Sequence, residues 1–509
     1  MPGTYISRWL VQNFKAFGPE TEPIELAPIT LLLGANSSGK SSLLASIRVM
    51  QQALSNDDGI YFEPSSAKLD LGKWAGLLHG QVAQAAARRG DEDEETEENQ
   101  EIRQSMTLGL QLADSHAEER PTGPMSLKLE FGAEPQSPVS TCDSMAFMLG
   151  NQLQNPPTLE LHAAHVYDRH PENDPPLWYL DAKPTESLIS QRLAESIPEL
   201  RNEVLDLAKR VLSSPNDPGD KLIAPLVSLV LSTRHGRPLE FAGLDQFLER
   251  CKAEDRPPPR AVDWFQRHLK GELNQALEQS LGRTSGLLSH FQHIAPLREP
   301  PRRFYSWSES ESDIRGTGAG LHGLLSRRPN LLPLISNDFK KLEINLEIEL
   351  REFGLQQTPY LITYELRPEN DPHLELSLCD VGQGVSQVLP ILASTRLEEI
   401  DIASIEQPEL HLHPRQQASL MDVLMNAVLS NESSLNQVIL ETHSEPMLLR
   451  LKRRIREGLQ RDQVAIIAIE NLGDGRGSRA RRLEIAEDGT LLDPLPQSFS
   501  NVRLNDQWA

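Results

Sequence analysis

The spacing of apolar residues predicts a mixed α/β chain whose first part contains strands and one helix. The stretch from Lys40 to about Leu54 has apolar residues three and four positions apart, which is typical of a helix. Two runs, at 106–112 and 125–131, alternate apolar and polar residues as half-buried antiparallel strands do. Further apolar runs predict strands at 9–14, 24–26 and 29–33. We assign residues 1–143 to the first part of an α/β domain.

The pattern changes in residues 144–288, for which we expect an inserted helical domain. Helical periodicity is found at 186–212, 220–232 and 261–281, and proline-rich joints separate these stretches. Heptads are not sustained over several repeats, so the pattern does not indicate a long coiled coil.

Alternating strands and helices return in residues 289–509. Helical stretches at 414–429 and 445–458 separate apolar runs at 400–405, 438–440 and 464–469. A strand–helix–strand order of this kind requires crossover connections and therefore predicts a parallel sheet. We expect the first and third parts of the chain to form one α/β domain that the helical insertion splits.

Composition narrows the function classes. The chain has 509 residues and three cysteines without a CxxC pair, and this sparse set of cysteines predicts a reducing, cytoplasmic environment. The formal net charge of −23 argues against general affinity for the nucleic-acid backbone. No run of 18 apolar residues and no signal-peptide pattern is found, so we expect neither a membrane span nor secretion. Residues 91–101 contain eight acidic residues and no basic one, which predicts a disordered loop or a segment that attracts a basic partner.

The strongest chemical signal is the segment GANSSGKS at 34–41, which fits GxxxxGK[ST] between a predicted strand and a predicted helix. Glycines allow the loop to curl so that its N–H groups face a phosphate at the positive end of the helix. Lys40 is expected to neutralise the outer phosphates of a nucleotide, and the Ser41 hydroxyl to bind magnesium. The nucleotide-binding residues expected here are Gly34, Asn36, Ser37, Ser38, Gly39, Lys40, Ser41 and Ser42.

Two later strands end near groups suited to a magnesium–phosphate site. The strand at 400–405 is followed by Glu406, the candidate for holding the metal or its water, although a surface acid after a core strand is the alternative. Glu409 follows in the same loop. The strand at 438–440 is followed by His443, which is expected to approach a terminal phosphate or the attacking water unless its role is structural.

A second glycine-led helix start is predicted in the segment DVGQGVSQ, residues 380–387. Gly382, Gly384 and Ser386 lie where a helix beginning near Val385 would offer free N–H groups to an anion. Because the chain has one obvious nucleotide loop, this cradle suggests the phosphate of a neighbouring subunit. A plain helix cap is the alternative.

Together these segments resemble the ABC-type ATPase heads of SMC, RecF and OLD proteins. GANSSGKSSLL, DVGQGVSQ, EQPELHLHP and ETHS stand where that family has its Walker A, signature, Walker B and switch-histidine motifs. The residues of these motifs are most similar to those of stand-alone bacterial AAA-family ATPases of the OLD/SMC-like kind, many of which are found in anti-phage defence systems such as Septu. The resemblance covers residues 1–80 and 289–509.

The resemblance implies a P-loop fold with ATP and Mg²⁺ as cofactors, and a head-to-tail dimer in which the signature segment of one copy covers the nucleotide of the other. Gln407 stands where such heads carry a catalytic glutamate, so hydrolysis is expected to be slow or to rely on other residues of the site. The signature segment also has valine where the first serine of LSGGQ is expected. The catalytic candidates are Glu406, Gln407, Glu409 and His443, and the metal candidates are Ser41 and Glu406.

Three functions are compatible with these features. The leading one is a nucleotide-gated dimeric switch that controls a separately encoded effector, such as a nuclease, in anti-phage defence; this role follows from the resemblance alone. A RecF-like ATPase that clamps on DNA is the second, and an ATP-binding scaffold with little hydrolysis is the third. A basic cluster after His443 is either a solvated helix face or a docking patch for DNA or a partner, and it comprises Arg450, Lys452, Arg453, Arg454 and Arg456.

Overall fold

The structure is a computed structural model. It describes residues 3–56, 60–66, 69, 71–80, 104–114, 126–133, 140–148, 158–164, 177–180, 253, 275, 278–306, 316–355, 358–371, 373–430, 434–473 and 475–496. The helices expected at 186–212 and 220–232 and the acidic segment 91–101 lie outside the described residues. No helix within the described ranges is long and apolar enough to cross a bilayer.

The central sheet combines both ends of the chain. Its strand order is β10-β15-β16-β3-β17-β18, and it is parallel except for the last pair. The strands are β10 (Phe291–Ile294), β15 (Ile402–Glu406), β16 (Gln437–Glu441), β3 (Ile29–Leu33), β17 (Val464–Asn471) and β18 (Ser478–Arg482). Glu406 pairs with Glu441, and Glu441 pairs with Leu32. The carboxyl ends of β15, β16 and β3 therefore meet at one edge of the sheet.

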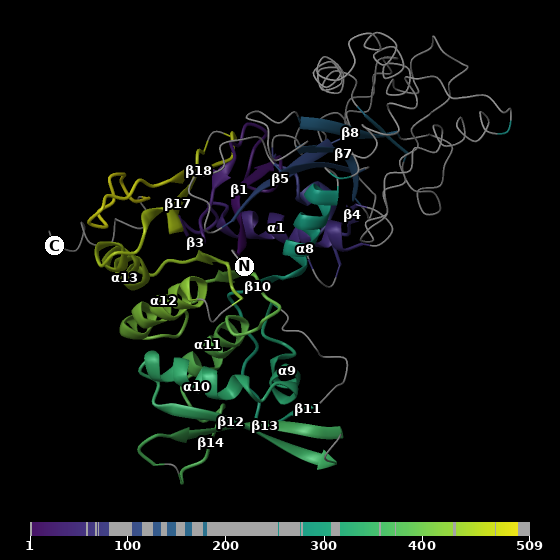
Figure 1. Cartoon of the computed structure of the whole chain (residues 1–509). Helices are drawn as coiled ribbons and strands as arrows, with labels where there is room; N and C mark the ends of the chain where they lie inside the picture. Colours follow the sequence, from purple (N-terminus) through teal and green to yellow (C-terminus); the bar gives the residue numbers. More distant parts are fainter. Residues whose placement is uncertain are drawn as a thin grey trace.

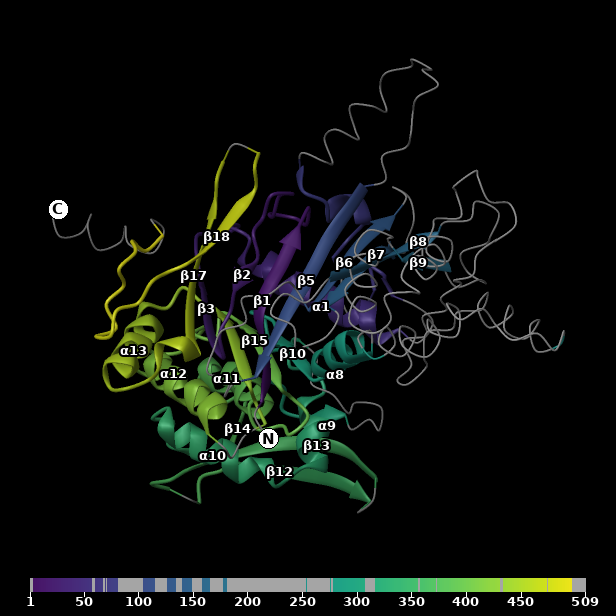
Figure 2. The ribbon, with the colours of Figure 1, turned by 45° about the horizontal axis from the view of Figure 1, so that its top comes forward.

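Helices cover both faces of this sheet because successive side chains of a strand point to opposite sides. On one face, Leu32 and Ile467 join a core that contains Leu44 of helix α1 (Lys40–Ser55). On the other face, Leu31 and Ile466 join the core of four later helices. These are α10 (Leu331–Lys341), α11 (Gln383–Ser394), α12 (Pro414–Leu429) and α13 (Glu445–Arg456). In Figures 1 and 2, α11, α12 and α13 lie side by side, away from α1.

Two antiparallel sheets flank this centre. The first has the order β2-β1-β5-β6-β7-β8-β9, with β4 beside β7, and its side chains share a core with α1. Its strands are β2 (Ile24–Glu25), β1 (Thr4–Gln12), β5 (Gln104–Asp114), β6 (Leu127–Ala133), β7 (Ser140–Met148), β8 (Thr158–Ala164), β9 (Leu177–Leu180) and β4 (Tyr61–Phe62). The short helix α8 (Arg283–Ser289) also contacts α1.

The second flanking sheet lies at the far end of the α10–α12 layer, at the bottom of Figure 1. Its order is β11-β13-β12, with β14 beside β13. Its strands are β11 (Tyr305–Ser306), β13 (Thr358–Pro368), β12 (Leu346–Leu355) and β14 (Leu376–Ser377), and the short helix α9 (Leu321–Arg327) lies close by. Ile348 and Leu366 of this sheet share a core with Ile335 and Phe339 of α10.

The helical domain expected from residue 144 does not begin there. Strand β7 crosses that boundary, and β8 and β9 extend the first sheet to Leu180, because β7 pairs with β6 on one side and with β8 on the other, and β8 pairs with β9. The alternating segment TLELH at 158–162 was the available sequence signal. The expectation of helical structure is therefore wrong for these strands, whereas most of residues 181–277 lie outside the described ranges.

Candidate nucleotide-binding site

The loop between β3 and α1 curls tightly around the start of the helix. Gly39 has a φ of 109°, in the left-handed region that favours glycine, and Ser37 has a φ of 62°. A Cβ on Gly34 would lie 2.3 Å from the carbonyl oxygen of Ile469 in β17. The Ser38 hydroxyl is buried and has no hydrogen-bond partner among the described residues. Glycine is thus required at position 34 by the close approach of β17 and at position 39 by its backbone conformation.

Lys40 and Ser41, the first residues of α1, both face Glu441. The Lys40 side chain is buried, and its Nζ donates to the carbonyl oxygens of Gly34 at 3.1 Å and Ala35 at 2.8 Å. The same Nζ lies 3.8 Å from Glu441 Oε1, and Ser41 Oγ donates to Glu441 Oε2 at 2.7 Å. Burial lowers the pKa of Lys40, while the nearby carboxylates, first that of Glu441, counteract this effect.

Sequence reasoning missed Glu441. It is the last residue of the buried strand β16. The rule that selected Glu406, a carboxylate at the end of a buried strand, applies equally to Glu441.

Glu406 and Glu441 form a pair of desolvated carboxyl groups at the sheet edge. Burial raises the pKa of Glu406 to about 7, and the charge of Glu441 contributes to the rise. Burial also raises the pKa of Glu441. A divalent cation would relieve both the burial cost and the repulsion, and the oxygens of Ser41, Glu406 and Glu441 are hard ligands of the kind that Mg²⁺ prefers. No three His, Cys, Asp or Glu side chains converge on a metal position in the described part of the chain.

Gln407, directly after β15, has an uncommon backbone conformation with a φ of 44°. Its N–H donates to the carbonyl oxygen of Glu441 at 2.7 Å. Arg298 Nη2 donates to the carbonyl oxygens of Glu406 at 2.8 Å and Gln407 at 3.3 Å. Burial lowers the pKa of Arg298 to about 10, and its Nε and Nη1 have no partner within the described residues. Arg298 was not assigned a role from the sequence, because an arginine in a loop has no periodic signal.

Glu409 and His443 meet on the next part of this edge. Glu409 accepts hydrogen bonds from Thr442 Oγ1 and from the backbone N–H of His443, both at 2.8 Å. The His443 side chain is exposed to solvent on one side, but the protein around it removes part of its hydration. This desolvation, together with the positive charge of Lys40, lowers the pKa of the imidazole and favours its neutral form at pH 7. The structure therefore brings the catalytic candidates together near the phosphate loop: Glu406, Gln407, Glu409 and His443.

The second glycine-led helix start lies on the opposite face of the central sheet from α1. A Cβ on Gly382 would meet nothing within 4 Å, whereas a Cβ on Gly384 would lie 2.6 Å from the carbonyl oxygen of His411. The Ser386 hydroxyl donates to the carbonyl oxygen of Gln383 in its own helix at 2.8 Å. None of these contacts involves residues 34–42 of the same chain.

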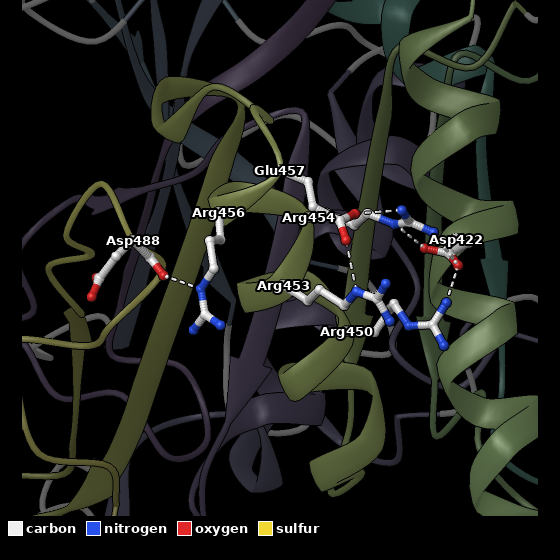
Figure 3. A network of polar contacts seen from close by, with 7 residues as sticks. All are labelled: Asp422, Arg450, Arg453, Arg454, Arg456, Glu457 and Asp488. Carbon is white, nitrogen blue, oxygen red and sulfur yellow. Dashed lines mark hydrogen bonds and ion pairs between the residues drawn. The ribbon is translucent and has the colours of Figure 1, made fainter.

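Most of the basic cluster on α13 has partners within the chain (Figure 3). The ion pairs are Arg450–Asp422, Arg454–Asp422, Arg453–Glu457 and Arg454–Glu457, and Arg456 Nε donates to the carbonyl oxygen of Asp488. The two pairs with Asp422 join α13 to α12, and the ion pairs together compensate part of the positive charge. They favour the interpretation as a structural helix face over that as a DNA-docking patch.

Comparison with known proteins agrees with the P-loop topology. The family model described as "AAA domain, putative AbiEii toxin, Type IV TA system" matches residues 29–450. Curated proteins give no match.

Solved structures of SMC head domains align at low similarity. The Pyrococcus furiosus head, bound to the C-terminal domain of ScpA, has 10% identity and a TM-score of 0.38, with coverage of 94% of this chain and 96% of that one. The Pyrococcus yayanosii head has 12% identity and a TM-score of 0.37, with coverage of 94% and 97%. The Thermotoga maritima head has 10% identity and a TM-score of 0.32, with coverage of 94% and 99%. These values are too low to support a conclusion.

The match to the family model does support a conclusion about the family of this chain. It spans most of the chain and includes the phosphate loop and the strands β15 and β16 that end in Glu406 and Glu441. The chain has an α/β P-loop fold and belongs to the AAA-domain family that this model describes.

Proposed function

We propose that the chain binds Mg-ATP at residues 34–41, hydrolyses it slowly and acts as a nucleotide-gated dimeric switch. The cluster of Lys40, Ser41, Glu406 and Glu441 carries this proposal, since it places a cation, a hydroxyl and two carboxyl groups beside a curled loop at a helix N-terminus. Ligands of open α/β sheets bind at this carboxyl edge of the strands.

Some residues of the site would bind the nucleotide and magnesium, and others would take part in hydrolysis. Lys40 would exchange its two carbonyl partners for phosphate oxygens, and the N–H groups at the start of α1 would bind the same phosphates. Ser41, Glu406 and Glu441 would hold magnesium, which supplies positive charge next to the phosphates when bound. A neutral His443 can orient a water. Gln407 can hydrogen-bond that water but cannot take its proton as a carboxylate does, so turnover is expected to be slow.

The start of α11 supports the dimeric part of the proposal. Gly382 is open to its surroundings, and α11 lies on the opposite sheet face from α1, so this helix start does not complete the site of its own chain. It is suited to covering the phosphates of a second copy. Nucleotide would then hold two copies together, and hydrolysis would release them.

The cellular role is an extension of this proposal. The sequence resemblance, together with a family description that names a toxin of a type IV toxin–antitoxin system, supports a cytoplasmic switch that controls a separate effector, such as a nuclease, in anti-phage defence. The net charge of −23 and the paired arginines of α13 weigh against a DNA-clamping ATPase. If the protein does not hydrolyse ATP, the scaffold alternative applies, and the absence of a catalytic glutamate at Gln407 would explain the missing turnover.

ATP titration with and without magnesium tests the site. Wild-type protein is expected to bind ATP more tightly with magnesium. Glu441→Gln is expected to weaken magnesium-dependent binding roughly 10- to 100-fold, as for the loss of one charged ligand. The exposed Glu398→Gln is the matched control and should bind as the wild type does. Protein that takes up no adenine nucleotide in the presence of magnesium would refute the proposal.

Hydrolysis and dimerisation need separate measurements. Phosphate release by the wild type no higher than that by Lys40→Ala would leave a nucleotide-binding scaffold rather than an enzyme. Light scattering with and without Mg-ATP would report on the dimer, and an unchanged mass would remove the dimeric switch.

A further inference from the structure

The loop after β15 makes contacts that the proposed chemistry does not require. Both carboxylate oxygens of Glu409 are engaged: Oε2 accepts from Thr442 Oγ1 and Oε1 from the backbone N–H of His443, each at 2.8 Å. Thr442 Oγ1 in turn accepts from the backbone N–H of Ser444 at 3.0 Å. The Glu409 carboxylate thus binds the turn between β16 and α13, which carries the His443 side chain.

A second tether joins the same two segments. Ser444 Oγ donates to Gln417 Oε1 of α12 at 2.6 Å, and Gln417 Nε2 donates to the carbonyl oxygen of Leu412 at 2.9 Å. Ser444 is also the N-cap of α13, because its hydroxyl accepts from the N–H of Met447 at 3.2 Å. The turn at 442–444 is therefore attached to the loop at 409–412 at two points.

The His443 imidazole is exposed while its main chain is bound. A backbone that is held on both sides fixes the position of Cα and the direction of the Cα–Cβ bond, which limits where the imidazole can reach and matters for a group that must orient a water. The Glu409 carboxylate has the geometry of such a support. A general base, in contrast, needs its oxygen directed at the water and not at a backbone N–H and a threonine hydroxyl.

We propose that Glu409 is a positioning residue that holds the His443 turn, and that it is not the proton acceptor of the reaction. The loop it belongs to also lies against the start of α11, where the carbonyl oxygen of His411 and the side chain of Leu412 approach Gly384. The same loop therefore touches both the histidine turn and the helix that would face a second copy. The catalytic consequence rests on the proposed function, whereas the tether exists without nucleotide.

Amide hydrogen exchange of the nucleotide-free protein tests the tether directly. Glu409→Gln replaces one acceptor oxygen with an NH₂ group, so exchange in residues 441–447 is expected to rise about 10-fold, while residues 34–42 remain unchanged. Thr442→Ser keeps the hydroxyl and should exchange as the wild type does. Glu398→Gln controls for the loss of one negative charge. Wild-type exchange in residues 441–447 of Glu409→Gln would overturn the proposal whether or not the protein hydrolyses ATP.

Kinetics separates positioning from proton transfer. Glu409→Gln and Thr442→Val are each expected to lower turnover about 10-fold with Mg-ATP affinity within about twofold, and the double variant to be no slower than the slower single one, because both remove the same support. Loss of a general base would cost about 10²- to 10⁴-fold, and Thr442→Val would not reproduce it. Full activity of Thr442→Val beside an inactive Glu409→Gln would overturn the positioning role.

Discussion

Two glycine-led helix starts, at α1 and at α11, look alike in sequence and differ in structure. The start of α1 is enclosed, since a Cβ on Gly39 would lie 2.9 Å from the side chain of Ala16 and 3.2 Å from the hydroxyl of Ser478. Lys40 and Ser41, which follow it, both contact Glu441 from a strand far along the chain.

The start of α11 has no such lysine, hydroxyl and carboxylate contacts, although Gly384 lies close to the carbonyl oxygen of His411. Gly382 is open, and the Ser386 hydroxyl is occupied within its own helix. A helix N-terminus offers partial positive charge in both places, but only α1 is joined by a buried lysine and two carboxyl groups. The start of α1 thus has, together with the ends of β15 and β16, the groups that the proposed magnesium–phosphate site requires, whereas the start of α11 would only complete such a site.

The largest effect on Mg-ATP affinity is expected at the enclosed start of α1. Lys40→Ala should lower the affinity for Mg-ATP about 100-fold or more, because the phosphates lose a buried cation. Lys340→Ala, on a half-exposed lysine that pairs with Glu347 and Glu369, is the matched control and should leave binding unchanged. Isothermal titration calorimetry measures both. An affinity for the Lys40 variant within about threefold of the wild type would mean that the two helix starts do not differ as proposed.

The carboxyl pair beside α1 predicts a pH dependence of stability in metal-free protein. The pKa of Glu406 is about 7 in the folded protein and about 4.5 in the unfolded chain. The proton is bound in both states below pH 4.5, and folding becomes less favourable as the pH rises from 4.5 to 7. Glu406→Gln removes this loss, so the variant should be more stable than the wild type by about 1–3 kcal/mol at pH 8 and by less than about 1 kcal/mol at pH 5.

Urea unfolding in the presence of a chelator measures this difference. Glu398→Gln, on an exposed carboxylate, should show no comparable dependence on pH. A Glu406 variant whose advantage is the same at pH 5 and pH 8 would show that the carboxyl pair is not desolvated as described.

A smaller effect separates the two glycines of α11. Gly384→Ala should destabilise the protein by about 1–2 kcal/mol, because its Cβ would lie 2.6 Å from the carbonyl oxygen of His411. Gly382→Ala should change stability by less than about 0.5 kcal/mol, since its Cβ enters open space. Thermal unfolding of the two variants provides the comparison. Equal melting temperatures would contradict the contact between α11 and the loop after β15.

The smallest effect concerns Ser386. Ser386→Ala should leave the nucleotide affinity of a single chain within about twofold and weaken ATP-dependent dimerisation by no more than about threefold, because the Ser386 hydroxyl would have to exchange its bond to the carbonyl oxygen of Gln383 for one across the interface. Alanine is well tolerated in a helix, so folding should not change. Sedimentation velocity at several protein concentrations measures the dimer. A variant that binds ATP poorly as a monomer would place α11 in the site of its own chain instead.

The sequence by itself determined the elements whose signals are local. The strand at 29–33 and the helix at 414–429 have the bounds expected from the pattern, because a continuous apolar run before Gly34 and a proline after the capping His413 specify backbone and burial within a few residues. The phosphate loop was predictable for the same reason, because the backbone curvature that requires its glycines is confined to one turn.

The tertiary structure decided what depends on distant partners. Ser41 and Glu441 are 400 positions apart, and they meet only because β3 pairs with β16. The same holds for Arg298, which reaches the carbonyl oxygens of Glu406 and Gln407, and for Glu409, which holds the turn of His443. Local periodicity specifies which face of an element is buried, whereas the order in which strands pair specifies which strand ends become neighbours, and that order is not written in any single segment of the chain.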